Sequence, residues 1–183
     1  MSFVQVGLLC AVSVVLGSAP MRPIETCCGP AAPGLDAAES ASEAFARIKG
    51  LAGTWVRVGE NGEPTDEVIS QSRVTAGGSA VIETLFPGTE HEMITLYHLD
   101  GENLVLTHYC VLRNQPHMKA TMIAEDRIVF VCDETGVESA DEAHMHQGTI
   151  VWAGENRLKT EWLQFTNGEK TYTASFDIVW QAK

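Results

Sequence analysis

The sequence predicts an all-β protein: a closed antiparallel up-and-down barrel of about ten strands, with a short N-terminal helix capping one end. Three observations lead to this prediction. After Gly50, short segments rich in β-branched and aromatic residues recur at even spacing. Asp-Gly, Asn-Gly and Gly-Gly pairs separate several of them, and such pairs favour hairpin turns because they tolerate positive φ. Helical patterns between the strands are missing from the sequence, which argues against a parallel α/β sheet.

The predicted barrel domain, residues 37–183, follows two N-terminal segments. Residues 1–20 contain the apolar stretch VQVGLLCAVSVVLGSAP, which ends in small residues and predicts a signal peptide. No Lys or Arg precedes this stretch, so translation from Met21 is the alternative. Residues 21–36 are rich in Pro, Gly, Ala and Cys and predict a flexible leader. We therefore expect a secreted or periplasmic protein.

Composition bounds the class of protein. The 183 residues are 45% apolar, which suits one domain with a sizeable core. A net charge of −12 disfavours a nucleic-acid partner, because an acidic surface repels phosphates. No long apolar run occurs after the N-terminal stretch, so no membrane span is expected in the mature protein. The sequence leaves open the oligomeric state, and also whether Cys110 and Cys132 pair.

The elements follow in order. Residues 37–49, AAESASEAFARIK, predict a helix with Phe45 and Ile48 on one face, ended by Gly50. The ten predicted strands are GTWVRV, EVISQSRVT, SAVIETLF, EMITLYHL, LVLTHYCVL, HMKATMIA, RIVFVCD, HMHQGTIVWA, LKTEWLQF and TYTASFDIVW. Closure into a barrel removes exposed strand edges, and a barrel of this strand number is wide enough to leave an interior cavity.

The segment LAGTW, which opens the first strand directly after the helix, resembles the Gly-x-Trp start of calycin barrels. In that superfamily the Trp packs across the closed end, so the resemblance implies that Trp55 plugs the floor of the barrel. Ten strands fit the fatty-acid-binding-protein and nitrobindin branches better than the eight-stranded lipocalins. Gly53, Trp55 and Gly59 match the nitrobindin-like pattern, but Arg57 stands where a further Gly is expected, so haem binding does not carry over. The block from Leu85 to Met118 is similar to exported bacterial lipocalin-like proteins, which implies the fold and no particular activity.

Alternation along the strands predicts which side chains face the interior. Charged Arg157, Lys159 and Glu161 alternate in the ninth strand, so Trp162 faces inward. In the eighth strand His144 and His146 face inward if Trp152 opposes Leu158, and a shift of one residue reverses this. The symmetry of the LDGENL hairpin places His108 near Thr95 and Leu106 near Tyr97. The predicted ligand-binding residues are His108, His146, Trp162, Tyr172, Phe176, Met118, Met122 and Tyr97.

The HMHQG stretch raises a chemical alternative. His144 and His146 on one strand face can supply two nitrogen ligands to zinc or another borderline metal. The third ligand would come from His108, His117, His91, Glu142 or Asp141. The competing interpretation is that both rings form hydrogen bonds in a polar rim. A single inward His could also bind haem iron.

The expected function is binding of a small, largely apolar molecule in the interior cavity. One alternative is a metal- or haem-dependent enzyme that uses His108, His144 or His146. Another is a structural envelope module with a filled barrel and no ligand. The sequence does not settle whether any reaction is catalysed, because nucleophile elbows, phosphate loops and paired carboxylates are missing from it.

Overall fold

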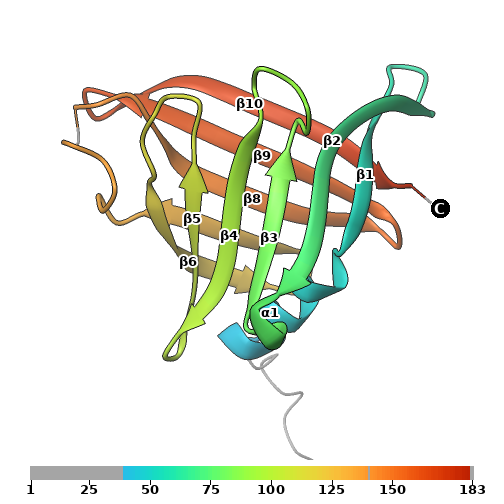
Figure 1. Ribbon diagram of the computed structural model, residues 1–183, viewed down its shortest axis with the longest axis horizontal. Helices are drawn as coiled ribbons and strands as arrows, with labels where there is room; N and C mark the ends of the chain where they lie inside the picture. The colour runs from blue at the N-terminus through green and yellow to red at the C-terminus, as the bar shows by residue number, and fades with distance from the viewer. Residues whose placement is uncertain (1–38, 140, 182–183) are drawn as a thin grey trace, which may run out of the picture. The chain divides into compact units, whose positions relative to one another are not determined.

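The computed structural model describes residues 39–139 and 141–181, which form a closed ten-stranded barrel (Figure 1). Every strand pairs antiparallel with its neighbours in sequence, and β1 pairs with β10 to close the ring. The predicted up-and-down barrel is therefore confirmed. The predicted signal peptide, 1–20, and leader, 21–36, lie outside the described residues.

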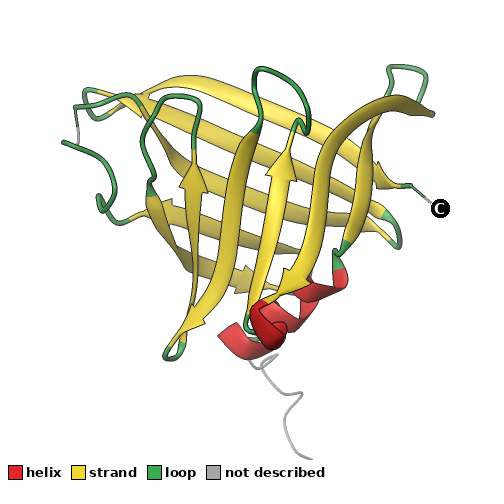
Figure 2. Cartoon of the chain, in the orientation of Figure 1, coloured by secondary structure: helices red, strands yellow, loops and turns green. Residues whose placement is uncertain are grey.

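Strands account for most of the described chain (Figure 2). They are β1 Gly53–Val58, β2 Pro64–Thr75, β3 Ala80–Leu85, β4 Met93–Asp100, β5 Asn103–Tyr109, β6 His117–Ala124, β7 Arg127–Cys132, β8 His144–Gly154, β9 Arg157–Thr166 and β10 Glu169–Trp180. A short 3₁₀ turn, Ala76–Gly78, joins β2 to β3.

The helix α1, Ala41–Gly50, lies across one end of the barrel (Figure 1). It begins after Ser40, whose side chain accepts a hydrogen bond from the Glu43 N–H while the Glu43 carboxylate bonds back to the Ser40 N–H. This reciprocal pair is a capping box. Arg47 ties the helix to the β6–β7 turn by donating from Nη1 to the carbonyls of Ala124 and Glu125. Within residues 39–139 and 141–181, no helix is long and apolar enough to cross a bilayer.

Trp55 lies at the floor formed by this helix. Its side chain is buried, and its indole N–H donates to the Leu51 carbonyl, 2.9 Å away. Gly53 has φ +146, and a Cβ there would collide with the Trp180 indole. The glycine of the Gly-x-Trp segment is therefore needed for its backbone conformation and for the close approach of a second tryptophan.

The interior is largely filled by side chains from all around the ring. The buried cluster contains Ala44, Phe45, Ile48, Trp55, Ile69, Val81, Tyr97, Leu104, Leu106, Met118, Ile128, Phe130, Cys132, Ile150, Leu158, Trp162 and Ile178. The expected wide lumen is thus occupied mainly by aliphatic and aromatic side chains.

Met122 and Tyr172 depart from the predicted interior positions. Met122 is 52% exposed, because a register shift between Ala120 and Met122 inserts an extra residue and reverses the alternation of β6. Tyr172 is 57% exposed, near the start of β10. It follows the register shift after Lys170 and alternates with Ala174, Phe176 and Ile178, whose side chains lie in or against the core, so it shares their face. The predicted inward orientation is therefore wrong for Met122, whereas Tyr172 lies on the predicted face without being buried.

Candidate functional site

A cavity of about 20 Å³ remains inside the barrel, between α1 and Trp162. Most of its wall is aliphatic or aromatic. The lining residues are Ile48, Leu51, Trp55, Ile69, Ser70, Ser72, Val81, Glu83, Leu85, Tyr97, Ile150, Leu158, Thr160, Trp162 and Ile178. This volume is enough for about one water molecule or a group of similar size. Glu83 is the charged side chain in this wall.

Glu83 is held by hydroxyl groups from the strands on either side. Ser70 on β2 donates from Oγ to Glu83 Oε1 at 2.6 Å, and Tyr97 on β4 donates from its hydroxyl to Glu83 Oε2 at 2.7 Å. Glu83 pairs across the sheet with Ser72 on β2. Because residues two apart share a face of a strand, Ser70 faces the same interior as Glu83.

Burial dominates the electrostatics of this cluster. It raises the pKa of Glu83, while the hydrogen bonds from Ser70 and Tyr97 act in the opposite direction. Burial also raises the pKa of Tyr97 well above its usual value, and the neighbouring carboxyl adds to this effect. Tyr97 is therefore a neutral donor at physiological pH. The cluster presents a carboxyl group with two fixed donors at the edge of an apolar cavity.

His108 forms a second polar group in the interior. The ring is 1% exposed, its Nδ1 lies 2.9 Å from the Thr95 hydroxyl, and it packs against Trp162 with 4.8 Å between ring centroids. The predicted register is confirmed, since Thr95 pairs with His108 and Tyr97 with Leu106. Burial lowers the pKa of His108 to about 4, so the ring is neutral at physiological pH.

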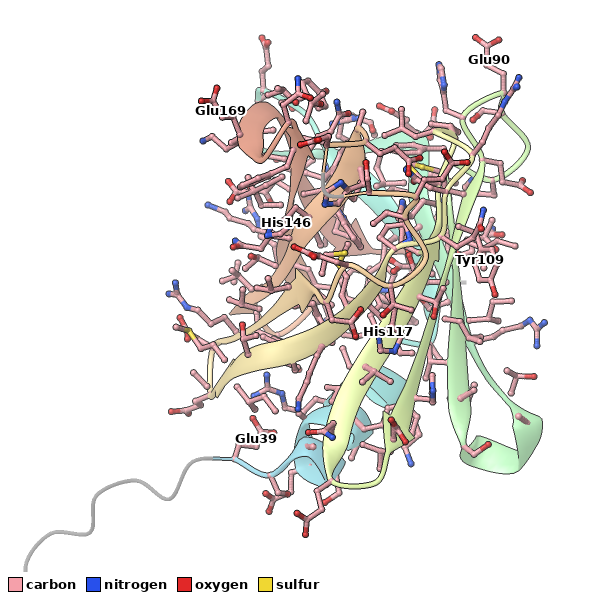
Figure 3. The ribbon with its side chains drawn as sticks, turned by 90° about the vertical axis from the view of Figure 1, so that its left-hand side faces the viewer. Glu39, Glu90, Tyr109, His117, His146 and Glu169 are labelled. Carbon is pink, nitrogen blue, oxygen red and sulfur yellow. The ribbon has the colours of Figure 1, made fainter. Side chains whose placement is uncertain are left out.

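His144 and His146 are hydrogen-bonded to each other. His144 Nδ1 lies 2.7 Å from the Glu142 carbonyl, and its Nε2 lies 3.1 Å from His146 Nδ1. Because a carbonyl only accepts, His144 Nδ1 carries a proton; when both rings are neutral, His146 then donates to His144. This chain leaves His146 Nε2 as the free acceptor. Figure 3 shows His146 beside the orange strands, while His117 lies by the yellow ones.

A bulge in β8 gives these two rings a different orientation from the predicted one. The register against β9 shifts between Met145 and Gln147, so strict alternation does not hold at His146. The His146 ring stacks on Phe165 with 4.3 Å between centroids. Phe165 is three residues from the inward Trp162, which puts it on the other face of β9. His144 pairs with Phe165 across the sheet, so both rings lie on the Phe165 side rather than on the cavity side, although His144 is only 2% exposed. Trp152 does oppose Leu158, but the bulge reverses the predicted inward orientation of His144 and His146.

The metal alternative lacks a third ligand in the described part of the chain. No group of three or more His, Cys, Asp or Glu side chains is arranged there to hold a metal ion. The proposed third ligands have other positions: His117 lies 2.6 Å from Asp133, Glu142 accepts from Asn114, and His91 is exposed beside Glu90. A metal role for His144 and His146 stays a prediction.

The interior also does not fit a haem. Pockets that enclose ligands of drug or cofactor size measure about 300–1,000 Å³, whereas this cavity measures about 20 Å³. The ring of His108 is covered by Trp162 and bonded to Thr95, so no open axial position faces a space of that size.

The other predicted ligand-binding residues divide between core and rim. Tyr97, Met118 and Trp162 belong to the buried cluster, and Tyr97 and Trp162 line the cavity. Phe176 is partly buried, and its ring contacts the Phe86 ring edge-on, with 5.4 Å between ring centroids.

Glu83 was not identified as a candidate site residue in the sequence analysis. Its signal was present, because Glu83 lies at alternate spacing between apolar Val81 and Leu85 in the third strand.

Two buried cysteines are free thiols. Cys110 follows β5 and Cys132 ends β7, so β6 lies between their strands. Cys110 Sγ lies 3.9 Å from Met93 Sδ. Burial raises the pKa of both thiols, which favours a role as small buried side chains over a role as nucleophiles.

A larger concavity of about 480 Å³ lies outside the lumen, against the end of α1. Trp152 and Trp180 form part of its wall. The Arg47 guanidinium stacks on the Trp152 ring at 4.0 Å and bonds to Glu39 at 2.7 Å. Its charge is therefore already engaged in holding the helix in place.

No family model, curated protein or solved structure matches this chain. The fold and the site thus define the class by themselves: a closed ten-stranded antiparallel barrel with a small, mainly apolar interior cavity that contains a hydrogen-bonded carboxyl group.

Proposed function

We propose that the barrel binds a small, largely apolar molecule in the interior cavity between Trp55 and Trp162. The observation that carries this proposal is the position of Glu83 at the cavity wall. Burying a carboxyl group is costly unless polar partners satisfy it. Ser70 and Tyr97 satisfy part of the hydrogen-bonding capacity of Glu83, and a ligand in the cavity could bond to its remaining lone pairs.

The proposal places the chain among calycin-like barrels. Support comes from the order of helix, Gly-x-Trp and ten strands, together with the position of Trp55 at the helix-covered end. Export to a secreted or periplasmic location is part of the same proposal. It rests on the apolar stretch in residues 1–20 and its small-residue end.

A structural module with a filled barrel is the second candidate. The observation that favours it is the dense interior cluster, which leaves only about 20 Å³ beside Trp162. A ligand larger than about one water molecule would have to displace side chains of this cluster. The two candidates therefore differ in whether small molecules enter the lumen.

Amide-resolved NMR titration with n-propanol distinguishes them. Ligand entry is expected to produce saturable shifts at lumen residues such as Val81, Ile150 and Leu158. The cavity-filling variant Ile150→Phe is expected to abolish these shifts, while Val74→Phe, at an exposed position on β2, should keep them. Shifts confined to Trp152 and Trp180 would place binding in the outer concavity. Unsaturable shifts throughout would favour the filled barrel.

A further inference from the structure

We infer that the lumen selects a cationic head group, so that its ligand is a small amine with a short apolar body. This inference rests on the proposed lumen binding and adds the chemical class of the ligand. It follows from the charge, the remaining hydrogen-bond capacity and the size of the cavity around Glu83.

The charged group in the cavity wall is acidic. Glu83 is its charged member, and no ion pair involves Glu83 among residues 39–139 and 141–181. Arg57 is engaged elsewhere, because its guanidinium bonds to Glu67 and lies over the Phe176 ring. His108 is neutral in the interior. A negative ligand would therefore meet an acid with no cation beside it, whereas a positive ligand would supply the missing counter-charge.

The hydrogen-bond capacity of Glu83 points to a donor ligand. An ionised carboxylate has about four lone-pair sites, and Ser70 and Tyr97 each fill one. Because both neighbours donate, the unfilled sites call for further donors. An alkylammonium group has three N–H donors and no acceptor, like the side chain of Lys. The cavity-facing part of Glu83 thus matches an ammonium group in both charge and donor count.

The hydrogen bonds to Glu83 leave the cavity-facing part of its carboxyl group available to a ligand. The bonds of 2.6 and 2.7 Å from Ser70 and Tyr97 are normal hydroxyl hydrogen bonds that come from the two neighbouring strands. Burial acts against the ionised form by raising the pKa of Glu83. A cation bound in the cavity would offset that cost, so the same burial that disfavours the empty charged site strengthens its attraction for a cation.

The size of the cavity limits the length of the ligand's apolar chain. About 20 Å³ between Ile150, Leu158 and Trp162 accommodates a group of about the size of one water molecule, such as an ammonium head, and each added carbon atom has to displace part of the surrounding wall. The aliphatic wall beside Glu83 provides contact for such a short chain. The expected ligand is therefore a short-chain amine rather than a fatty acid or a large polycyclic molecule.

The test compares three probes with the same carbon chain and different head groups: n-propylamine, n-propanol and propionate. Amide-resolved NMR titrations of the full chain at neutral pH give a dissociation constant for each, from the shifts of lumen residues. The amine is protonated at this pH, as a Lys side chain is. We expect it to bind at least about tenfold more tightly than the alcohol, because a charge-assisted hydrogen bond replaces a neutral one. Propionate is expected to bind most weakly.

Glu83→Gln keeps the shape of the side chain and removes its charge, and it should bring amine and alcohol to similar affinity. Glu161→Gln is the matched control, since it removes an exposed acid outside the cavity and should preserve the preference for the amine. This control separates the lumen from general attraction of cations to a chain of net charge −12. If Glu83→Gln does not fold, equal lumen binding of amine and alcohol in the unaltered protein would still overturn the inference.

Each outcome has one meaning. Tighter amine binding at lumen residues, lost in Glu83→Gln and kept in Glu161→Gln, supports the inference. Equal lumen binding of amine and alcohol would overturn the inference and leave the proposed lumen binding intact. Amine preference lost equally in both variants would assign it to overall charge and overturn the inference. Lack of lumen shifts with all three probes would overturn both the inference and the proposed function.

Discussion

Acidification is expected to destabilise the barrel through His108. The folded protein holds this ring at a pKa of about 4 because it is buried against Trp162, whereas the ordinary value is 6.5. Between these pH values the unfolded chain binds the proton and the folded protein does not. The free energy of unfolding therefore rises with pH in this window, and it falls as the pH is lowered from 6.5 to 4.

The magnitude follows from the difference between the two pKa values. They differ by about 2.5, and each unit corresponds to about 1.36 kcal/mol. Acidification across the window is therefore expected to remove about 3 kcal/mol of stability through this one side chain. That is a large fraction of the 5–15 kcal/mol typical of a folded domain.

Urea unfolding monitored by tryptophan fluorescence at pH 7, 6, 5 and 4 measures this contribution. The comparison is with His108→Gln, whose amide can still bond to the Thr95 hydroxyl but does not titrate. Other titrating groups, including Glu83, act in both proteins and cancel in the difference. The unaltered protein should lose about 3 kcal/mol more than His108→Gln between pH 7 and pH 4. Parallel stability curves for the two proteins would refute the reasoning that His108 is buried and neutral.

Three further substitutions test the floor of the barrel and its helix. Trp55→Ala should lower the free energy of unfolding by about 3–5 kcal/mol, since it leaves a void at the closed end; a melting temperature close to that of the parent would show that Trp55 is not the plug. Gly53→Ala should cost about 1–3 kcal/mol in urea unfolding, because the new Cβ collides with Trp180, and a neutral result would mean that this ring moves freely. Ser40→Ala should cost about 1 kcal/mol by removing the capping box with Glu43, and unchanged stability would show that the helix end contributes little.

The architecture could be predicted because its signals are local. Turn-forming pairs such as the Asp-Gly at 100–101 divide the chain into strands, and closure follows from the need to cover strand edges. The pairing of Thr95 with His108 could also be predicted, since a tight hairpin fixes the register of the two strands it joins.

Side-chain orientation failed where a bulge intervenes. One extra residue reverses the alternation, so Met122 lies outside although Met118 lies in the core. The same effect applies at His146, beyond the shift after Met145. No residue type marks these bulges in the sequence, because they arise from the register that two strands must share as the barrel closes.

The two polar groups in the lumen show why an acid, rather than an imidazole, is the better candidate for ligand recognition. His108 meets the cost of burial by staying neutral, and it is covered by Trp162 and bonded to Thr95. Glu83 instead gathers hydroxyl donors from both neighbouring strands while part of it lines the cavity. If its role were only to tie β2, β3 and β4 together, Glu83→Gln would be nearly as stable, and amine and alcohol would bind alike in the parent protein. A carboxyl group kept in an apolar wall, with hydroxyl donors on both sides and no cation beside it among the described residues, is most simply explained by a ligand that brings the positive charge.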